Sequence, residues 1–379
     1  MAENKDKKVL NVPNLRFPEF QGEWVVSRLS EYLNENKERN KKGLFNKTDV
    51  LSVSGDFGIV NQIDLLGRSF AGASVLPYHV VRLGNIVYTK SPLKEYPYGI
   101  VKANTGKVGI VSTLYAVYSV NDNANDKFIE YYFSLANRAN RYFKPIVRIG
   151  AKHDMKISNQ EVLANQVVFP TVKEQEKIAD FLSLIDERIS TQNKIIEKLE
   201  SLIKGIAQNI VRYNKPNVRL SDCLSCSSST LQESDVSEHG TYPVYGANGV
   251  VGYLDNYNTE NEAIYIIKDG SGVGSTSYVT GKCSATGTLN ILRAKEGYSL
   301  QYLYYMLKVF NFEPYKTGMA IPHIYFKDYG KAKVFCPTYK EQLQYARLLS
   351  AIDKRLTVEH GLLTSLSLQK QYLLRQMFI

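Results

Sequence analysis

The chain has 379 residues, and its 44% hydrophobic and 22% charged content is typical of a folded protein with two or three domains. It lacks the run of roughly 18 apolar residues that a membrane-spanning helix needs, and it begins with a charged segment instead of an apolar signal. Four cysteines are too few for a disulfide framework, so we expect a reduced, cytoplasmic protein without a membrane partner.

The first part of the chain carries most of the net charge of +10. Residues 1–170 have 23 Lys and Arg against 16 Asp and Glu. β-Branched runs at residues 84–89 and 108–112 predict strands, and residues 126–140 predict a helix. A basic surface suits a nucleic acid, because Lys and Arg neutralise phosphates. Many proteins are mildly basic without such a partner, so charge alone does not decide between the two.

A long helix is predicted next, and its beginning returns 167 residues later. The sequence PTVKEQEKIADFLSLIDER at residues 170–188 recurs as PTYKEQLQYARLLSAIDKR at residues 337–355 without a gap. An internal repeat of this kind predicts two equivalent structural units in one chain.

Start signals agree with a helix in each copy of the repeat. Thr171 stands three residues before Glu174, and Thr338 stands in the same relation to Glu341, a spacing that predicts a capping box. A first helix over residues 172–213 would be about 60 Å long at 1.5 Å per residue.

Both copies place apolar residues at alternating spacings of four and three, the period of a coiled coil. A polar residue, Gln192 or Glu359, occupies the same seam position in each copy. Such a pair either fixes the alignment of the two helices or forms a solvated layer. Burial of both apolar stripes is simplest if the helices pair antiparallel. The predicted seam comprises Ile178, Leu182, Ile185, Ile189, Gln192, Ile196, Leu199, Leu349, Ile352, Leu356, Glu359, Leu363 and Leu366.

The block between the repeats, residues 216–336, is nearly neutral, with 10 Lys and Arg against 11 Asp and Glu. Residues 263–268 predict a strand and residues 300–310 a helix. Turn-rich loops such as GANG at residues 246–249 fit a strand scaffold that carries recognition residues.

Motifs for catalysis and metal binding do not reach the spacing that their chemistry needs. The sequence has no Pro-Pro dipeptide, which an amino-methyltransferase motif requires. The run GSGVG at residues 270–274 is followed by a predicted strand, so a tight turn is favoured over a dinucleotide site. Cys223 and Cys226 form one C-x-x-C pair without the second pair of a zinc site. We therefore expect no catalytic residue, metal or cofactor in this chain.

Several segments together resemble the specificity subunit of type I restriction–modification systems, over essentially the whole chain. The twin P-T-x-K-E-Q helices are the most specific of these. The others are VPNLRFPEFQGEW at 12–24, GNIVYTKS at 84–91, GKVGIVSTLYAVY at 106–118, YPVYGANGVVGYLDNY at 242–257 and IKDGSGVGSTSYVTGKCSATGTLNIL at 267–292.

The resemblance implies an α+β fold with two mixed α/β target-recognition domains, separated by two long helices that form an antiparallel coiled coil. The implied divisions are a first target-recognition domain at 1–170, a central spacer helix at 171–215, a second target-recognition domain at 216–336 and a distal spacer helix at 337–379.

The function that the resemblance implies is recognition of double-stranded DNA, with each domain binding one half of a bipartite asymmetric site. The helices would dock two methyltransferase subunits and, through them, motor–nuclease subunits. S-adenosylmethionine, ATP and Mg would be bound by those partners, and this chain would be non-catalytic. The alternative is a coiled-coil assembly scaffold whose globular blocks bind a partner other than DNA.

Candidate DNA contacts follow from chemistry and loop position, because Lys and Arg hold phosphates while Asn, Ser and Thr also read base edges. Any single residue of this kind is more often an ordinary solvated side chain. The candidates are Lys90, Lys102, Asn104, Lys107, Arg148, Lys152, His153, Asn248, Lys268, Ser271, Lys282, Thr288, Asn290 and His323.

Overall fold

The computed structural model describes residues 10–149 and 155–379, which form two compact units. Unit 1 comprises the described residues up to Ser190 together with Thr364–Ile379, and unit 2 comprises Thr191–Leu363. Two long helices, α5 (Val172–Tyr213) and α9 (Tyr339–Gln376), each contribute to both units. The continuous helix predicted for residues 172–213 is confirmed.

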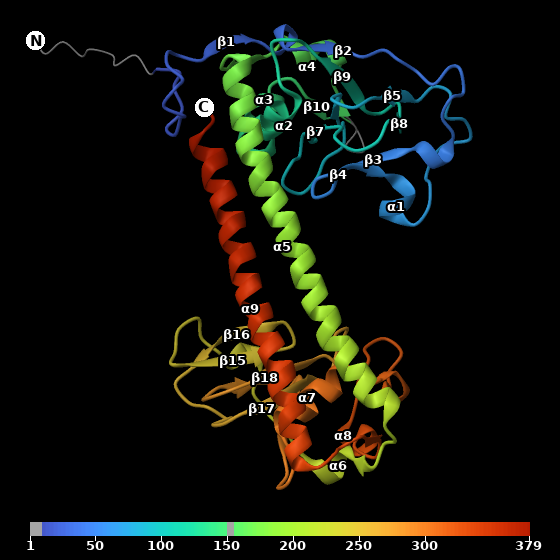
Figure 1. Ribbon diagram of the computed structural model, residues 1–379, viewed down its shortest axis with the longest axis vertical. Coiled ribbons are helices and arrows are strands. Elements are labelled where there is room, and N and C mark those ends of the chain that lie inside the picture. Colours follow the sequence, from blue (N-terminus) through green and yellow to red (C-terminus); the bar gives the residue numbers. More distant parts are fainter. Residues whose placement is uncertain (1–9, 150–154) are drawn as a thin grey trace, which may run out of the picture. The chain divides into compact units, whose positions relative to one another are not determined.

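Unit 1 is built on a four-stranded antiparallel sheet in the order β2-β9-β6-β7, against which helix α2 packs (Figure 1). Ile86 in the sheet centre pairs with Ala103 on one side and Tyr118 on the other. The strands are β1 (Val25–Arg28), β2 (Leu33–Glu35), β3 (Leu51–Ser54), β4 (Gly58–Asn61), β5 (His79–Val81), β6 (Ile86–Tyr88), β7 (Val101–Ala103), β8 (Gly109–Val111), β9 (Ala116–Val120), β10 (Arg148–Ile149), β11 (Met155–Lys156) and β12 (Gln166–Phe169). The short helices are α1 (Gln62–Leu66), α2 (Asp126–Ser134), α3 (Ala136–Phe143) and α4 (Asn159–Ala164), with 3-10 turns at Leu29–Glu31 and Lys47–Asp49.

Unit 2 repeats this plan with a four-stranded antiparallel sheet in the order β14-β20-β17-β18, covered by helix α7. Ile264 in its centre pairs with Tyr278 and Leu292. The strands are β13 (Val218–Arg219), β14 (Leu224–Ser228), β15 (Tyr242–Gly246), β16 (Gly249–Leu254), β17 (Ala263–Ile267), β18 (Thr276–Val279), β19 (Ser284–Ala285), β20 (Leu289–Ala294) and β21 (Lys333–Val334). The short helices are α6 (Leu220–Cys223), α7 (Leu300–Lys308) and α8 (Phe326–Tyr329), with 3-10 turns at Glu233–Asp235 and Glu313–Tyr315.

The two units share the topology of their main sheet and differ in their accessory strands, which form the pairs β3-β4, β5-β8 and β10-β11 in unit 1 and a three-stranded sheet β16-β15-β19 in unit 2. In each, a four-stranded sheet of the same strand order precedes one packing helix, and a two-stranded ladder, β1-β12 or β13-β21, closes the domain before the long helix begins. The predicted fold of two mixed domains and two long helices is therefore confirmed. One boundary differs, because Leu135 has an extended backbone (φ −84°, ψ 119°) that ends α2 within the helix predicted at 126–140.

The long helices pair antiparallel within each unit, and in unit 1 the end of α9 lies beside the beginning of α5 (Figure 1). In unit 2 the side-chain amide of Gln192 donates to the backbone oxygen of Glu359 at 3.0 Å and also to its carboxylate. Gln192 is 5% exposed and Glu359 2%, so the polar layer is buried rather than solvated. Every residue of the predicted seam is buried or half-buried.

In each unit, a glutamine of the repeat forms a hydrogen bond to the start of the helix that packs on the main sheet. In unit 1, Gln175 accepts the backbone N–H of Asn125, the N-cap of α2, at 3.0 Å and donates to the carbonyl of Pro170 at 3.0 Å. In unit 2, Gln342 accepts the N–H of Ser299, the N-cap of α7, at 2.9 Å. Both glutamines are fully buried.

An aspartate eleven residues further along the repeat makes a second equivalent bond. Asp186 accepts the hydroxyl of Tyr131 on α2 at 2.7 Å, and Asp353 accepts that of Tyr305 on α7 at 3.4 Å. We call each Gln and Asp pair, Gln175 with Asp186 or Gln342 with Asp353, the helix anchor. In each unit, the repeated sequence therefore holds one helix of the domain, α2 or α7, against the long helix.

We expect Gln175→Leu and Gln342→Leu each to lower the free energy of unfolding by about 2 kcal/mol, because the N–H at the start of α2 or α7 loses its acceptor. Gln344→Leu is the matched control, since Gln344 is exposed on the same helix as Gln342. Urea unfolding followed by circular dichroism measures the difference. Equal losses of unfolding free energy in all three variants would contradict a stabilising role for the helix anchor.

Candidate nucleic-acid interface

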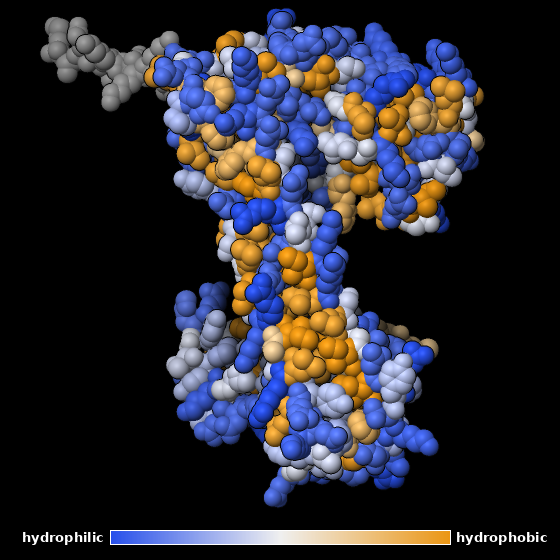
Figure 2. Space-filling view, in the orientation of Figure 1, coloured by the Kyte–Doolittle hydropathy of each residue, from blue (hydrophilic) through white to orange (hydrophobic). Residues whose placement is uncertain are grey.

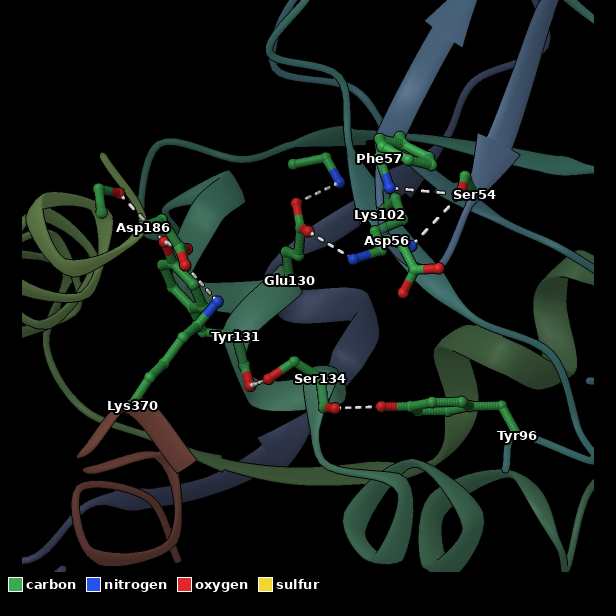
Figure 3. A network of polar contacts seen from close by, with 12 residues as sticks. Ser54, Asp56, Phe57, Tyr96, Lys102, Glu130, Tyr131, Ser134, Asp186 and Lys370 are labelled. Atoms are coloured by element: carbon green, nitrogen blue, oxygen red, sulfur yellow. Dashed lines mark hydrogen bonds and ion pairs between the residues drawn. The ribbon is translucent and has the colours of Figure 1, made fainter. Parts of the chain in front are cut away.

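Lys102, a candidate from the sequence, lies on β7 and is paired within unit 1. Its ammonium group donates to Glu130 at 3.1 Å, and the other oxygen of Glu130 accepts the N–H of Ala103 at 3.0 Å (Figure 3). The neighbouring residue of α2, Tyr131, points to Asp186 of the helix anchor in the same view. The charge of Lys102 is therefore partly neutralised, and the network ties β7 and α2 to the long helix.

Lys90 is likewise held by protein groups. Its ammonium group donates to the side-chain oxygen of Asn159 at 2.8 Å, and the amide nitrogen of Asn159 donates to Glu35 at 2.8 Å. Burial lowers the pKa of Lys90, while the carboxylates of Glu35 and Glu161 act in the opposite direction. This chain of contacts connects the end of β6 with α4 and β2.

Asn104 and Lys107 belong to the turn between β7 and β8, and only one of them is free to meet a ligand. Asn104 is buried, and its amide donates to the carbonyl of Lys107 at 2.9 Å and that of Arg82 at 3.2 Å. The side chain of Lys107 is exposed. Asn104 therefore shapes the turn that presents Lys107.

Arg148 lies on β10, and its side chain is 83% exposed, 3.7 Å from the carboxylate of Glu161. An exposed ion pair of this length contributes little to stability, so the guanidinium can turn to a phosphate. Lys152 and His153 lie outside the described residues.

In unit 2, four candidates come together at the end of β17. The N–H of Lys268 donates to the carbonyl of Thr288 at 3.0 Å, and its carbonyl accepts the N–H of Ile324, the residue after His323, at 2.9 Å. His323 Nδ1 lies 2.7 Å from Asp269 Oδ1. Ser271 is exposed in the turn that follows. Basic and hydroxyl groups thus lie together at one end of the sheet.

Asn290 lies beneath this end of the sheet and is only 4% exposed. Its amide nitrogen donates to the hydroxyl of Tyr329 at 3.1 Å, and its oxygen accepts the hydroxyl of Ser228 at 3.1 Å. The side chain joins β14, β20 and α8, so it supports this end of the sheet from within.

Asn248 and Lys282 lie in loops beside the second sheet of unit 2, which consists of β16, β15 and β19. Asn248 is exposed in the turn between β15 and β16. The ammonium group of Lys282 is 4.8 Å from the ring centroid of Tyr257 and 6.0 Å from that of Tyr242. Hydrogen bonding to Tyr257 raises the pKa of Lys282, so this exposed side chain is a cation at neutral pH. Aromatic rings beside a cation are suited to nucleic-acid contacts.

Residues 37–47 form a basic loop that the candidates chosen from the sequence do not include. The loop has five Lys and Arg against one Glu. Arg39 donates to the carbonyl of Pro77 at 3.0 Å, which holds the loop beside β5. Its exposed cations are Lys37, Lys41, Lys42 and Lys47. Local charge density was the sequence signal that could have found it.

Within residues 10–149 and 155–379, no three His, Cys, Asp or Glu side chains are placed to hold a metal ion. No helix in these ranges is both long and apolar enough to cross a bilayer. Cys223 and Cys226 are free thiols, as are Cys283 and Cys336.

Comparisons with known proteins agree with this arrangement. The sequence profile of the type I restriction modification DNA specificity domain matches residues 81–201 and again residues 217–368. The specificity subunit of the type I restriction enzyme EcoprrI from Escherichia coli is 25% identical over 112 residues, 30% of this chain and 28% of that protein. The chain thus spans under a third of the length of this curated relative.

Two solved structures share the fold. The S subunit of a type I restriction–modification system from Mycoplasma genitalium is 16% identical, with a TM-score of 0.67 over 97% of this chain and 99% of that one. A chain from a structural study of complex assembly and conformational transition of the type I R-M system is 15% identical, with a TM-score of 0.51 over 94% and 97%. At this level of identity the likeness shows architecture alone.

Proposed function

Because this chain belongs to the type I restriction–modification DNA specificity subunits, we propose that it selects a bipartite, asymmetric DNA target, with one half read by each unit. The observation that supports this is the duplication of a whole domain together with its helix anchor. Two domains that share a main sheet but differ in their accessory strands and loops can bind two different half-sites.

The same duplication supports two docking sites for methyltransferase subunits on the long helices, with motor–nuclease subunits bound through them. Exposed apolar residues on these helices include Leu184, Leu202 and Leu368. Methyl transfer and cleavage, with S-adenosylmethionine, ATP and Mg, would then belong to the partners, and this chain would be non-catalytic.

Recognition of one half-site by each domain is tested by exchanging residues 216–336 for the matching block of a related subunit. The methylated DNA of the host is then sequenced. We expect one half of the modified target to change. The proposed division into domains at 1–170 and 216–336, with spacer helices at 171–215 and 337–379, predicts that the other half is retained. A change in both halves would contradict it.

Phosphate contacts by the basic loop are tested with a double substitution, Lys41→Ala with Lys42→Ala. We expect weaker binding of random duplex DNA by the purified chain and a log–log salt slope that is less steep by about 1.8, because each phosphate contact contributes about 0.9. Lys194→Ala with Lys198→Ala removes the same charge from exposed positions on α5.

Fluorescence anisotropy across a salt series measures both pairs. An equal loss of DNA affinity in the two double variants would mean that net charge alone, and not the basic loop, accounts for the effect. If DNA binding by the unsubstituted chain does not weaken as the salt concentration rises, an assembly scaffold is favoured over a DNA-recognition subunit.

A further inference from the structure

Equivalent glutamates of the repeat are held in two different ways. In unit 1 the carboxylate of Glu174 is 2% exposed and accepts both Nε and Nη2 of Arg16 at 2.7 Å, as well as the indole N–H of Trp24 at 3.2 Å. The capping box predicted there is therefore replaced by a buried ion pair. In unit 2 the predicted box forms, with Glu341 accepting the N–H of Thr338 at 3.1 Å and its hydroxyl at 2.7 Å.

The difference arises from a segment that only unit 1 possesses, residues 10–24, which we call the arm. Its Leu15 N–H donates to the carbonyl of Gln376 at 2.9 Å. The ring of Phe17 lies edge-on to Phe181 of α5, with centroids 5.7 Å apart. The arm thus covers the ends of both long helices in unit 1.

No arm precedes the equivalent strand of unit 2. Residues 28–33 of unit 1 correspond to residues 219–224, and only the short segment 214–218 separates the latter from the end of α5. The matching helix surface is consequently open. Leu348, the counterpart of the arm-covered Phe181, is 51% exposed, and Glu341 is exposed where Glu174 is buried.

This open surface of unit 2, formed by Glu341 and Leu348, which lie about two turns apart on one face of α9, is called the socket. In the space-filling view, hydrophobic side chains gather over the part of the long helices that belongs to unit 2 (Figure 2). A carboxylate and an exposed apolar side chain two turns away match Glu174 and Phe181, the residues that the arm contacts in unit 1.

We propose that the socket binds a segment of a partner protein with the chemistry of the arm, an arginine flanked by apolar and aromatic residues. On docking, Glu341 leaves Thr338 and takes the incoming guanidinium as Glu174 takes Arg16. A second copy of this chain is a poorer occupant, because its own arm is already held by two charge-assisted bonds. The inference concerns protein docking and stands apart from DNA recognition.

The test uses a fluorescent peptide of residues 10–24 added to the full chain, with binding followed by anisotropy. The tethered arm occupies unit 1 at high effective concentration, so the free peptide meets the socket alone. We expect one site, with affinity reduced about tenfold by Glu341→Gln, by Leu348→Asp, or by Arg16→Gln in the peptide.

Val358→Asp is the matched control, since Val358 is 62% exposed on the same helix and lies outside the socket. It should leave peptide affinity unchanged, and thermal unfolding should show that every variant folds. Absence of peptide binding, or binding that Glu341→Gln and Leu348→Asp do not weaken, would overturn the proposal. If the chain self-associates as its concentration rises and Leu348→Asp abolishes this, the occupant of the socket is a second copy of the chain and not a partner protein.

Discussion

Insertion of one heptad into both long helices is expected to widen the gap between the two half-sites by about three base pairs and to leave each half unchanged. The antiparallel contact of Gln192 with Glu359 places residues 192–198 opposite residues 353–359. Duplicating these two stretches adds about 10.5 Å at 1.5 Å per residue, against 3.4 Å per base pair. Seven residues also keep the seam nearly in phase.

The outcome is read by sequencing methylated DNA from cells that carry the variant with its partner subunits. Insertion into α5 alone is the control, and it should abolish modification because α5 is then about 10.5 Å longer than α9 can match, so the two helices cannot keep their contacts in both units. If the double insertion retains the original gap, the helix pair does not set the spacing of the target.

The long helices were predictable because their periodicity and repetition are local properties of the sequence. Only half of each helix anchor contact, the residue in the repeat, could be predicted from such local properties. Gln175 and Asp186 recur in both copies, but their partners Asn125 and Tyr131 lie 50 and 55 residues away. Nothing in the local pattern specifies a pairing over that distance, since it is made by the packing of α2 on the long helix.

Candidate DNA contacts were less predictable, because residue type does not reveal burial. Asn104 and Asn290 have the chemistry of base readers, yet both are buried and hold protein groups together. The basic loop at 37–47, by contrast, required a count of charge over neighbouring residues instead of a search for single polar side chains.

The capping box shows how a local rule can be overridden. Thr171 and Glu174 have the same spacing as Thr338 and Glu341, but the arm brings an arginine to the first glutamate. An ion pair with a guanidinium outweighs a cap at a solvent-exposed helix end. The arm is distant in sequence, so the two copies are alike locally and differ in the fold.

Arg16→Met is expected to destabilise unit 1 by about 3 kcal/mol, because it leaves the carboxylate of Glu174 buried without its cation. The indole of Trp24, the chain's single tryptophan, is 2% exposed and donates to the same carboxylate. Tryptophan fluorescence during urea unfolding therefore reports on this unit directly. Glu341→Gln, at the equivalent exposed position, should lower stability by no more than about 1 kcal/mol.

A double variant separates the loss of the ion pair from the burial of an unpaired charge. Arg16→Met combined with Glu174→Met replaces both charges by apolar groups, and such replacements are often close to neutral in stability. We expect the double variant to recover most of the stability that Arg16→Met loses. If it is as unstable as the single variant, the arm is held mainly by its packing on Phe181 and Phe378, and the glutamate would not be what distinguishes the two units.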